Sequence, residues 1–145
     1  MPEYQFFDSH CHIDFSEFDG DREMLLQQAF SLGINKMLVP GISLAQSKRL
    51  MGSRFESCII NASCKIQDLT PKFQLYYAIG LHPYFLSEHK THHIEALEAL
   101  YLLNRDKVIA IGECGIDGSI SDIELQKSLF IAHIALANKF ELPLI

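Results

Sequence analysis

Short apolar runs alternate along this chain with longer stretches of mixed polarity. The runs at 34–40, 75–81 and 108–112 are mostly apolar, and we expect each to form a buried strand. A further short run at 142–145 predicts the beginning of another strand. Strands that alternate with helices are typical of βα units around a parallel sheet. The pattern therefore predicts an α/β fold.

The stretches between these runs have apolar residues at helical spacing. We expect helices at 21–32, at 43–51, at 91–103 and from 121 onward. The second and the last begin with a serine followed three positions later by Gln or Glu, which is the capping-box pattern. The predicted buried stripes are Leu25, Ala29 and Leu32 in the first helix, Ile94, Leu97, Leu100 and Tyr101 in the third, and Leu125, Leu129, Ala132 and Leu136 in the last.

The apolar opening of the chain runs into a His-x-His pair formed by His10 and His12. If the strand continues through the pair, the two side chains point the same way, about 7 Å apart, and can converge on one cation. Asp8 and Asp14 would share that face, whereas Cys11 would point to the opposite one. Taken alone, the motif fits two hydrogen-bonded core histidines equally well.

Two later strands also end in residues that can bind metals. His82 follows the run 75–81, and Glu113 follows the run 108–112, with Asp117 four residues further on. In a parallel α/β sheet the carboxyl ends of the strands lie at one edge, where such folds build their sites. We therefore expect a common cluster of His10, His12, His82, Glu113 and Asp117.

With these motifs the chain resembles the TatD-like metal-dependent deoxyribonucleases, a family of amidohydrolase-type TIM barrels. The segments that carry the resemblance are 8–14, 80–83, 111–117 and 142–145. The resemblance implies a site for two divalent ions. It also implies that His10 and His12 bind one ion and that Glu113 bridges both.

The resemblance further sets expectations about extent. Barrels of this type have about 250 residues, so residues 1–145 are expected to form a single α/β domain. It would hold about strands one to five, the first half of a TIM (β/α)8 barrel, incomplete at the C-terminus. In the family a metal-binding His follows the last matching segment, and another His and an Asp come later. Open strand edges would promote self-association, and a catalytically incompetent half-barrel is one interpretation.

These features predict a hydrolase that cleaves phosphodiester bonds in DNA with two divalent cations, which are Zn, Mn, Mg or Co. Glu113 is the expected catalytic group, and His82 is expected to bind substrate near the scissile phosphate. Asp117 is expected to orient its loop or a ligand. Because related barrels use His-x-His sites on other bonds, hydrolysis of a small ester, lactone or amide is an alternative.

The formal net charge of −6 argues against a broad basic surface that grips duplex DNA. Bound cations would supply positive charge where a phosphate must sit. Single-stranded DNA or DNA ends are therefore the expected partners. The chain has no long apolar run and no secretion signal at its start, so we expect a cytoplasmic protein without a membrane partner.

The remaining Cys and His residues give weaker signals. The four cysteines lack zinc-site spacing and are expected to be free thiols in a reducing compartment. His89, His92 and His93 are expected to lie at a solvated helix end, and His133 is expected at the surface or at its boundary with the core.

Overall fold

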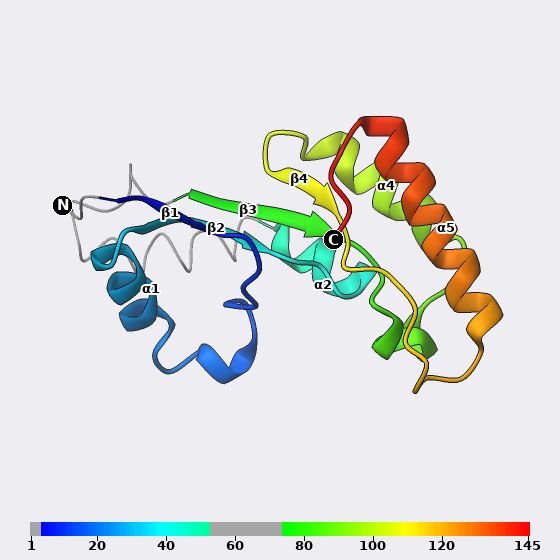
Figure 1. Cartoon of the computed structure of the whole chain (residues 1–145), viewed down its shortest axis with the longest axis horizontal. Helices are drawn as coiled ribbons and strands as arrows, with labels where there is room; N and C mark the ends of the chain where they lie inside the picture. The colour runs from blue at the N-terminus through cyan, green and yellow to red at the C-terminus, as the bar shows by residue number, and fades with distance from the viewer. Residues whose placement is uncertain (1–3, 53–73) are drawn as a thin grey trace. The chain divides into compact units, whose positions relative to one another are not determined.

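The chain forms alternating strands and helices in a computed structural model that describes residues 4–52 and 74–145 (Figure 1). The strands are β1 (Phe6–Asp8), β2 (Ile34–Val39), β3 (Gln74–Ile79) and β4 (Val108–Ile111). The helices are α1 (Arg22–Ser31), α2 (Leu44–Leu50), α4 (His93–Leu103) and α5 (Ile123–Phe140), together with the short 3-10 helices η1 (Ser16–Phe18) and η2 (Pro83–Glu88). The strand order in the sheet is β1-β2-β3-β4. The predicted α/β fold is confirmed.

The chain divides into two compact units. The first spans Met1–Val39 and Leu50–Tyr76, and the second spans Pro40–Arg49 and Tyr77–Ile145. The first unit therefore holds β1, α1 and β2, and the second holds α2, the end of β3, α4, β4 and α5. A single domain over 1–145 stays a prediction.

In the first unit, β1 pairs in parallel with β2, and α1 packs against β2. The last three residues of β2 are buried, as its apolar run predicted. The partner of Asp8 across the pair is Met37, so the final residue of β1 is anchored beside a core side chain.

Helix α1 buries a different face from the one predicted. Leu26 is its buried residue, whereas Leu25 and Ala29 are half-buried and Leu32 is 70% exposed. The predicted stripe is therefore wrong. Leu32 lies beyond the last helical turn, and Gly33 follows with a positive φ of 98°, which turns the chain into β2. Leu32, the last residue of the predicted stripe, is thus the C-cap of the helix.

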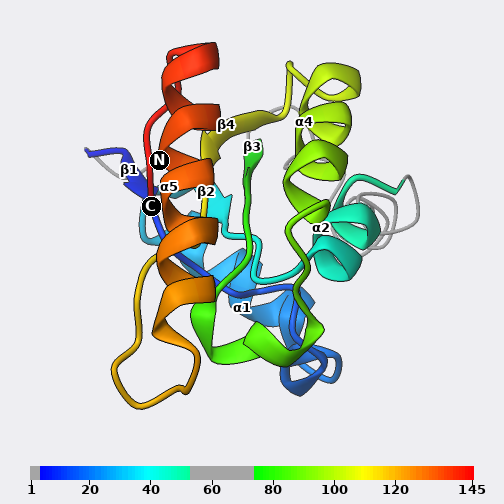
Figure 2. The ribbon, with the colours of Figure 1, turned by 90° about the vertical axis from the view of Figure 1, so that its right-hand side faces the viewer.

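In the second unit, α5 packs against both β4 and α4 (Figure 2). Leu97 and Tyr101 of α4 are buried as predicted, and so are Leu129 and Leu136 of α5. The other predicted stripe residues of these two helices, Ile94, Leu100, Leu125 and Ala132, are half-buried.

One predicted helix cap is confirmed and the other is shifted by one residue. The Ser43 hydroxyl accepts a hydrogen bond from the backbone N–H of Gln46 over 3.2 Å. At the start of α5, however, Asp122 and not Ser121 is the cap, because its carboxylate accepts from the N–H of Leu125 over 3.1 Å. Either side chain satisfies a backbone donor that the first turn leaves open.

The chain beyond α5 begins another strand, as predicted from the run at 142–145. Leu144 forms a parallel bridge with Ile111 of β4. The Ile111 N–H donates to the Pro143 carbonyl, and the Ile145 N–H donates to the Ile111 carbonyl, both over 2.9 Å.

Candidate functional site

The His-x-His pair lies in the segment after β1 and not within the strand. Strand β1 ends at Asp8, whose carboxylate accepts a hydrogen bond from the His10 N–H over 3.1 Å. The predicted strand alternation through the pair is therefore wrong. The two rings nevertheless approach each other, because the His10 and His12 ring centroids lie 5.3 Å apart at an interplanar angle of 82°. The His12 ring also stacks on Phe15, at 4.6 Å.

The thiol of the neighbouring Cys11 favours its protonated form. Burial raises the pKa of its thiol, and the nearby Asp8 carboxylate raises it further. A protonated thiol binds metals weakly, since the thiolate is the ligand form. That Cys11 stays outside a His-based metal site remains a prediction.

In the second unit, His82 lies shortly after the end of β3, beyond Gly80 and Leu81, and caps η2. Its N–H donates to the Ile42 carbonyl over 2.9 Å. Its Nδ1 accepts from the N–H of Tyr84 over 3.1 Å, so a neutral His82 ring carries its proton on Nε2. The half-buried ring thus offers a donor on the side away from the backbone.

Glu113 is positioned by close packing of backbone at the strand ends. Its N–H donates to the Gly41 carbonyl over 2.6 Å. A Cβ at Gly80 would collide with the Gly112 backbone, and a Cβ at Gly112 would collide with the Ile145 carbonyl oxygen. Gly80 therefore lets the segments that carry His82 and Glu113 approach each other, and Gly112 lets the second of these segments approach Ile145.

Asp117 orders its own loop. Its carboxylate accepts from the Ser119 N–H over 2.8 Å and from the Ser119 hydroxyl over 2.6 Å. These two hydrogen bonds lower the pKa of Asp117, and nearby His82 adds to the effect. The arrangement agrees with the first of the two roles expected for Asp117, orientation of the loop.

Two polar residues of α5 that the sequence did not single out for the site are buried and contact the segments near Asp117 and His82. The Gln126 side-chain carbonyl accepts from the Asp117 N–H over 2.8 Å, and its amide donates to the Ile120 carbonyl over 2.9 Å. His133 was predicted at the surface or its boundary, which is wrong, because it is fully buried. Both residues are at helical spacing from the core positions Leu129 and Leu136. A polar residue within an apolar stripe was the signal that could have found them.

The histidines before α4 also differ from their prediction. His89 is 5% exposed, and its Nε2 lies 2.9 Å from the His82 carbonyl oxygen. Burial lowers the pKa of His89. A solvated helix end thus describes His92, which is exposed, but not His89, and His93 is half-buried.

Cys11 and Cys114 are free thiols, as predicted, whereas Cys58, Cys64 and the rest of 53–73 lie outside the described residues. Burial raises the pKa of the Cys114 thiol to about 12, with a further contribution from Glu113. Cys114 is therefore a neutral thiol at physiological pH.

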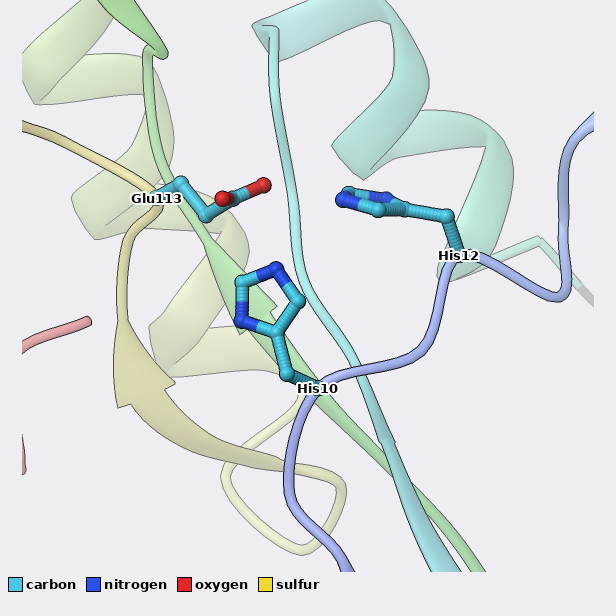
Figure 3. Close-up of side chains that lie close together, drawn as sticks. All are labelled: His10, His12 and Glu113. Carbon is cyan, nitrogen blue, oxygen red and sulfur yellow. The ribbon is translucent and has the colours of Figure 1, made fainter.

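The candidate residues divide between the two units. His10 and His12 belong to the first, whereas His82, Glu113 and Asp117 belong to the second. Figure 3 shows His10 and His12 on the segment after β1, and Glu113 on the segment after β4. Within residues 4–52 and 74–145, no helix is both long and apolar enough to cross a membrane.

Comparison with known proteins identifies one family. The sequence model of TatD related DNase matches residues 7–145. The chain is 33% identical over 144 residues to the uncharacterized metal-dependent hydrolase YjjV of Escherichia coli K12, covering 97% of this chain and 49% of the relative. It is 28% identical over 141 residues to the 3'-5' ssDNA/RNA exonuclease TatD of Shigella flexneri, covering 94% and 47%. The chain thus spans about half the length of the curated relatives it matches.

Solved structures give the same result. The crystal structure of YjjV, a TatD homologue from Escherichia coli, matches with a TM-score of 0.71 at 33% identity, over 96% of this chain and 49% of that one. A TatD family hydrolase from Entamoeba histolytica matches with a TM-score of 0.70 at 27% identity, over 95% and 47%. These matches confirm the predicted fold, the first half of a TIM barrel.

Proposed function

This chain belongs to the TatD-related DNase family, and we propose that it acts as a metal-dependent hydrolase of phosphodiester bonds in DNA, with single strands or DNA ends as substrate. His10, His12 and Glu113 are the proposed metal ligands, and His82 the proposed substrate contact. The name of the Shigella flexneri relative, a single-strand exonuclease, supports this substrate class.

The single observation that carries the proposal is the distance between the two imidazole rings after β1. A tetrahedral cation bound at about 2.1 Å to one nitrogen of each ring would hold the ring centroids roughly 5 Å apart. The observed distance is 5.3 Å. The distance between the two rings is therefore suitable for a shared cation.

Glu113 is the proposed carboxylate of the same centre. It follows β4 as the histidines follow β1, and the carboxyl ends of parallel strands share one edge of a sheet. Each of the three side chains offers one ligand atom of a type that divalent cations bind. Two imidazoles and a carboxylate suit Zn, Mn or Co, and we propose that Glu113 would also help to hold a second cation.

The bound cations would neutralise charge on the phosphoryl oxygens and make water a better nucleophile at neutral pH. His82 would hold the substrate, because its Nε2–H can donate to a phosphate oxygen. The Tyr84 N–H fixes this orientation by occupying Nδ1. The buried His89 ring contacts the His82 carbonyl and so helps to hold the backbone of His82 in place.

The test is metal binding and hydrolysis by the purified protein. Metal-free protein is titrated with Zn, Mn, Co and Mg in a calorimeter and then assayed on labelled single-stranded DNA, duplex DNA and a panel of amides and lactones. We expect cation-dependent cleavage of single strands. His10→Ala, His12→Ala and Glu113→Gln should each weaken metal binding at least tenfold.

His92→Ala is the matched control, because His92 is an exposed histidine outside the proposed centre. It should bind metal as the unmodified protein does. Turnover of the amide and lactone panel without DNA cleavage would replace the nuclease proposal by hydrolysis of small substrates. Unchanged metal affinity in all three ligand variants would overturn the proposed centre.

A further inference from the structure

A pocket of about 280 Å³ lies in the second unit beside the starts of α2 and α4 and the end of η2. All of its lining residues belong to that unit. They are Ser43, Leu44, Ala45, Lys48, Glu88 and His93. Since the volume is close to the lower end of small-molecule sites, about 300 Å³, the pocket suits one phosphate with its sugar.

The pocket lining adjoins the backbone segment that contacts His82 and Glu113. Ser43 directly follows Ile42, whose carbonyl accepts from the His82 N–H over 2.9 Å. One residue earlier, the Gly41 carbonyl accepts from the Glu113 N–H over 2.6 Å. The pocket is therefore built on the same short segment that positions His82 and Glu113.

Lys48 lines the pocket and Lys90 lies near it, in a chain of net charge −6. Lys48 is exposed and forms no ion pair with the residues that the structure describes. Burial lowers the pKa of His93, and nearby His92, His89, Lys90 and Lys48 lower it further. Glu88 is the acidic member of the lining.

The lining also offers hydrogen-bond capacity. The His93 Nδ1 is buried and has no hydrogen-bond partner among the described residues. The Ser43 oxygen accepts from the Gln46 N–H, which leaves its hydroxyl proton available to a ligand. An ammonium group and a hydroxyl donor together are the groups that bind phosphate oxygens in proteins.

We propose that this pocket binds a backbone phosphate of the single strand, next to the phosphate that is cleaved, with Lys48 and His93 as the contacts. This inference rests on the proposed function, because it assigns a second position on the same substrate. Lys48 would supply one local positive charge for the polyanion in an otherwise acidic chain.

The test measures binding without metal, so that it does not depend on hydrolysis. A fluorescein-labelled single-stranded deoxyoligonucleotide of eight nucleotides is titrated with the protein in EDTA, and its anisotropy is followed between 20 and 200 mM salt. Lys48→Ala should weaken binding about 3- to 10-fold at low salt and reduce the salt slope by about 0.7, the loss of one phosphate contact. Glu88→Gln should strengthen binding.

Lys127→Ala is the matched control. It removes the same charge from α5, where Lys127 is paired with Glu124 over 2.8 Å. It should keep its affinity within twofold, and Lys48→Arg should restore binding. Circular dichroism confirms that each variant is folded. Equal weakening of oligonucleotide binding in the Lys48 and Lys127 variants would show a general charge effect and would overturn the proposed role of the pocket.

Competition with inorganic phosphate distinguishes two possible ligands of the pocket, a phosphate of the strand and free phosphate. If the pocket binds the strand, phosphate should compete only weakly, and an eight-nucleotide strand should bind more tightly than a mononucleotide. Equal binding of both, together with strong competition by phosphate, would identify a free-phosphate site and overturn the strand assignment. Strand binding with no cleavage in the metal-loaded assay would contradict the proposed hydrolysis and leave this inference supported.

Discussion

The Nε2 atom of His133 accepts a hydrogen bond from the backbone N–H of Leu81 over 3.1 Å. The other ring nitrogen, Nδ1, lies 2.7 Å from the Leu129 carbonyl oxygen, to which it donates. The ring is therefore neutral, with its proton on Nδ1. Through this contact α5 holds the residue that directly precedes His82.

Removal of the His133 ring should destabilise the protein. His133→Ala leaves the buried Leu81 N–H without an acceptor and opens a cavity, so we expect a loss of about 2–4 kcal/mol in the free energy of unfolding. Urea denaturation followed by circular dichroism measures it. His133→Gln, whose carbonyl can accept from the same N–H, should lose less, and equal losses in the two variants would contradict the role of this hydrogen bond.

The same residue should make stability depend on pH. Burial lowers the pKa of His133 below its ordinary value of 6.5, with nearby His89 also lowering it, whereas the bond to Leu129 opposes the shift. The unfolded chain therefore binds the proton first as the pH falls below 6.5. Stability from neutral His133 is fully present above 6.5 and is lost as the pH falls from there toward the lowered pKa.

Urea midpoints measured between pH 8 and pH 5 test this dependence. The midpoint should fall on the acidic side, and the fall should be smaller in His133→Gln. Because burial lowers the pKa of His89 in the same direction, some acid dependence should persist in that variant. An identical pH profile in both proteins would show that His133 is not a source of it.

The backbone at Gly112 should not accept a side chain. Its φ is +139°, and a Cβ would collide with the Ile145 carbonyl oxygen. Gly112→Ala should therefore cost about 1–3 kcal/mol or more in the free energy of unfolding. Gly118→Ala is the matched control, since nothing lies within 4 Å of a Cβ there. Thermal melts of the two variants give the comparison, and equal melting temperatures would refute the packing argument.

The Asp117 side chain should determine the order of its loop. Asp117→Ala removes the acceptor of both Ser119 hydrogen bonds, so the Ser119 amide should exchange with solvent faster. Asp117→Asn keeps one acceptor and should exchange at an intermediate rate. Hydrogen exchange followed by NMR measures the three rates. Unchanged exchange in the alanine variant would mean that other contacts hold the loop.

Metal should stabilise the folded protein if the proposed centre is correct. A cation at 100 times its dissociation constant should raise the free energy of unfolding by about 2.7 kcal/mol. Melting temperatures with Zn or Mn, and again after EDTA, measure this effect. The increase should disappear in His12→Ala and persist in His92→Ala. A metal-induced increase that survives in His12→Ala would place the cation elsewhere.

Local sequence pattern was sufficient for much of the fold. The apolar runs that became β2, β3 and β4 are short and bounded by turn residues, so their positions follow from local chemistry. Ser43 predicted its cap for the same reason, because a cap joins residues only three apart. The predicted buried stripe of α1 was wrong, since the weak hydrophobic pattern of this helix does not distinguish Leu26 from Leu25.

Contacts between distant residues were beyond such patterns. His133 and Leu81 are 52 positions apart, and only the folded structure shows that the Leu81 N–H donates to the His133 ring. The His-x-His pair was singled out by its residue types, but its geometry was not predicted. The strand ends at Asp8, whose carboxylate accepts a hydrogen bond from the His10 N–H. Residue types therefore indicated the candidate pair, whereas its supporting contacts did not follow from the sequence.

The amide of Gln126 also limits how the loop before α5 can change in length. Besides its bonds to Asp117 and Ile120, it donates to the Ser121 carbonyl over 3.3 Å, so one helical side chain contacts both ends of the turn. An insertion between these ends would move at least one carbonyl out of reach of a buried amide. Natural variants of this protein should therefore tolerate substitutions at Gly118 and Ser119 far better than added or deleted residues.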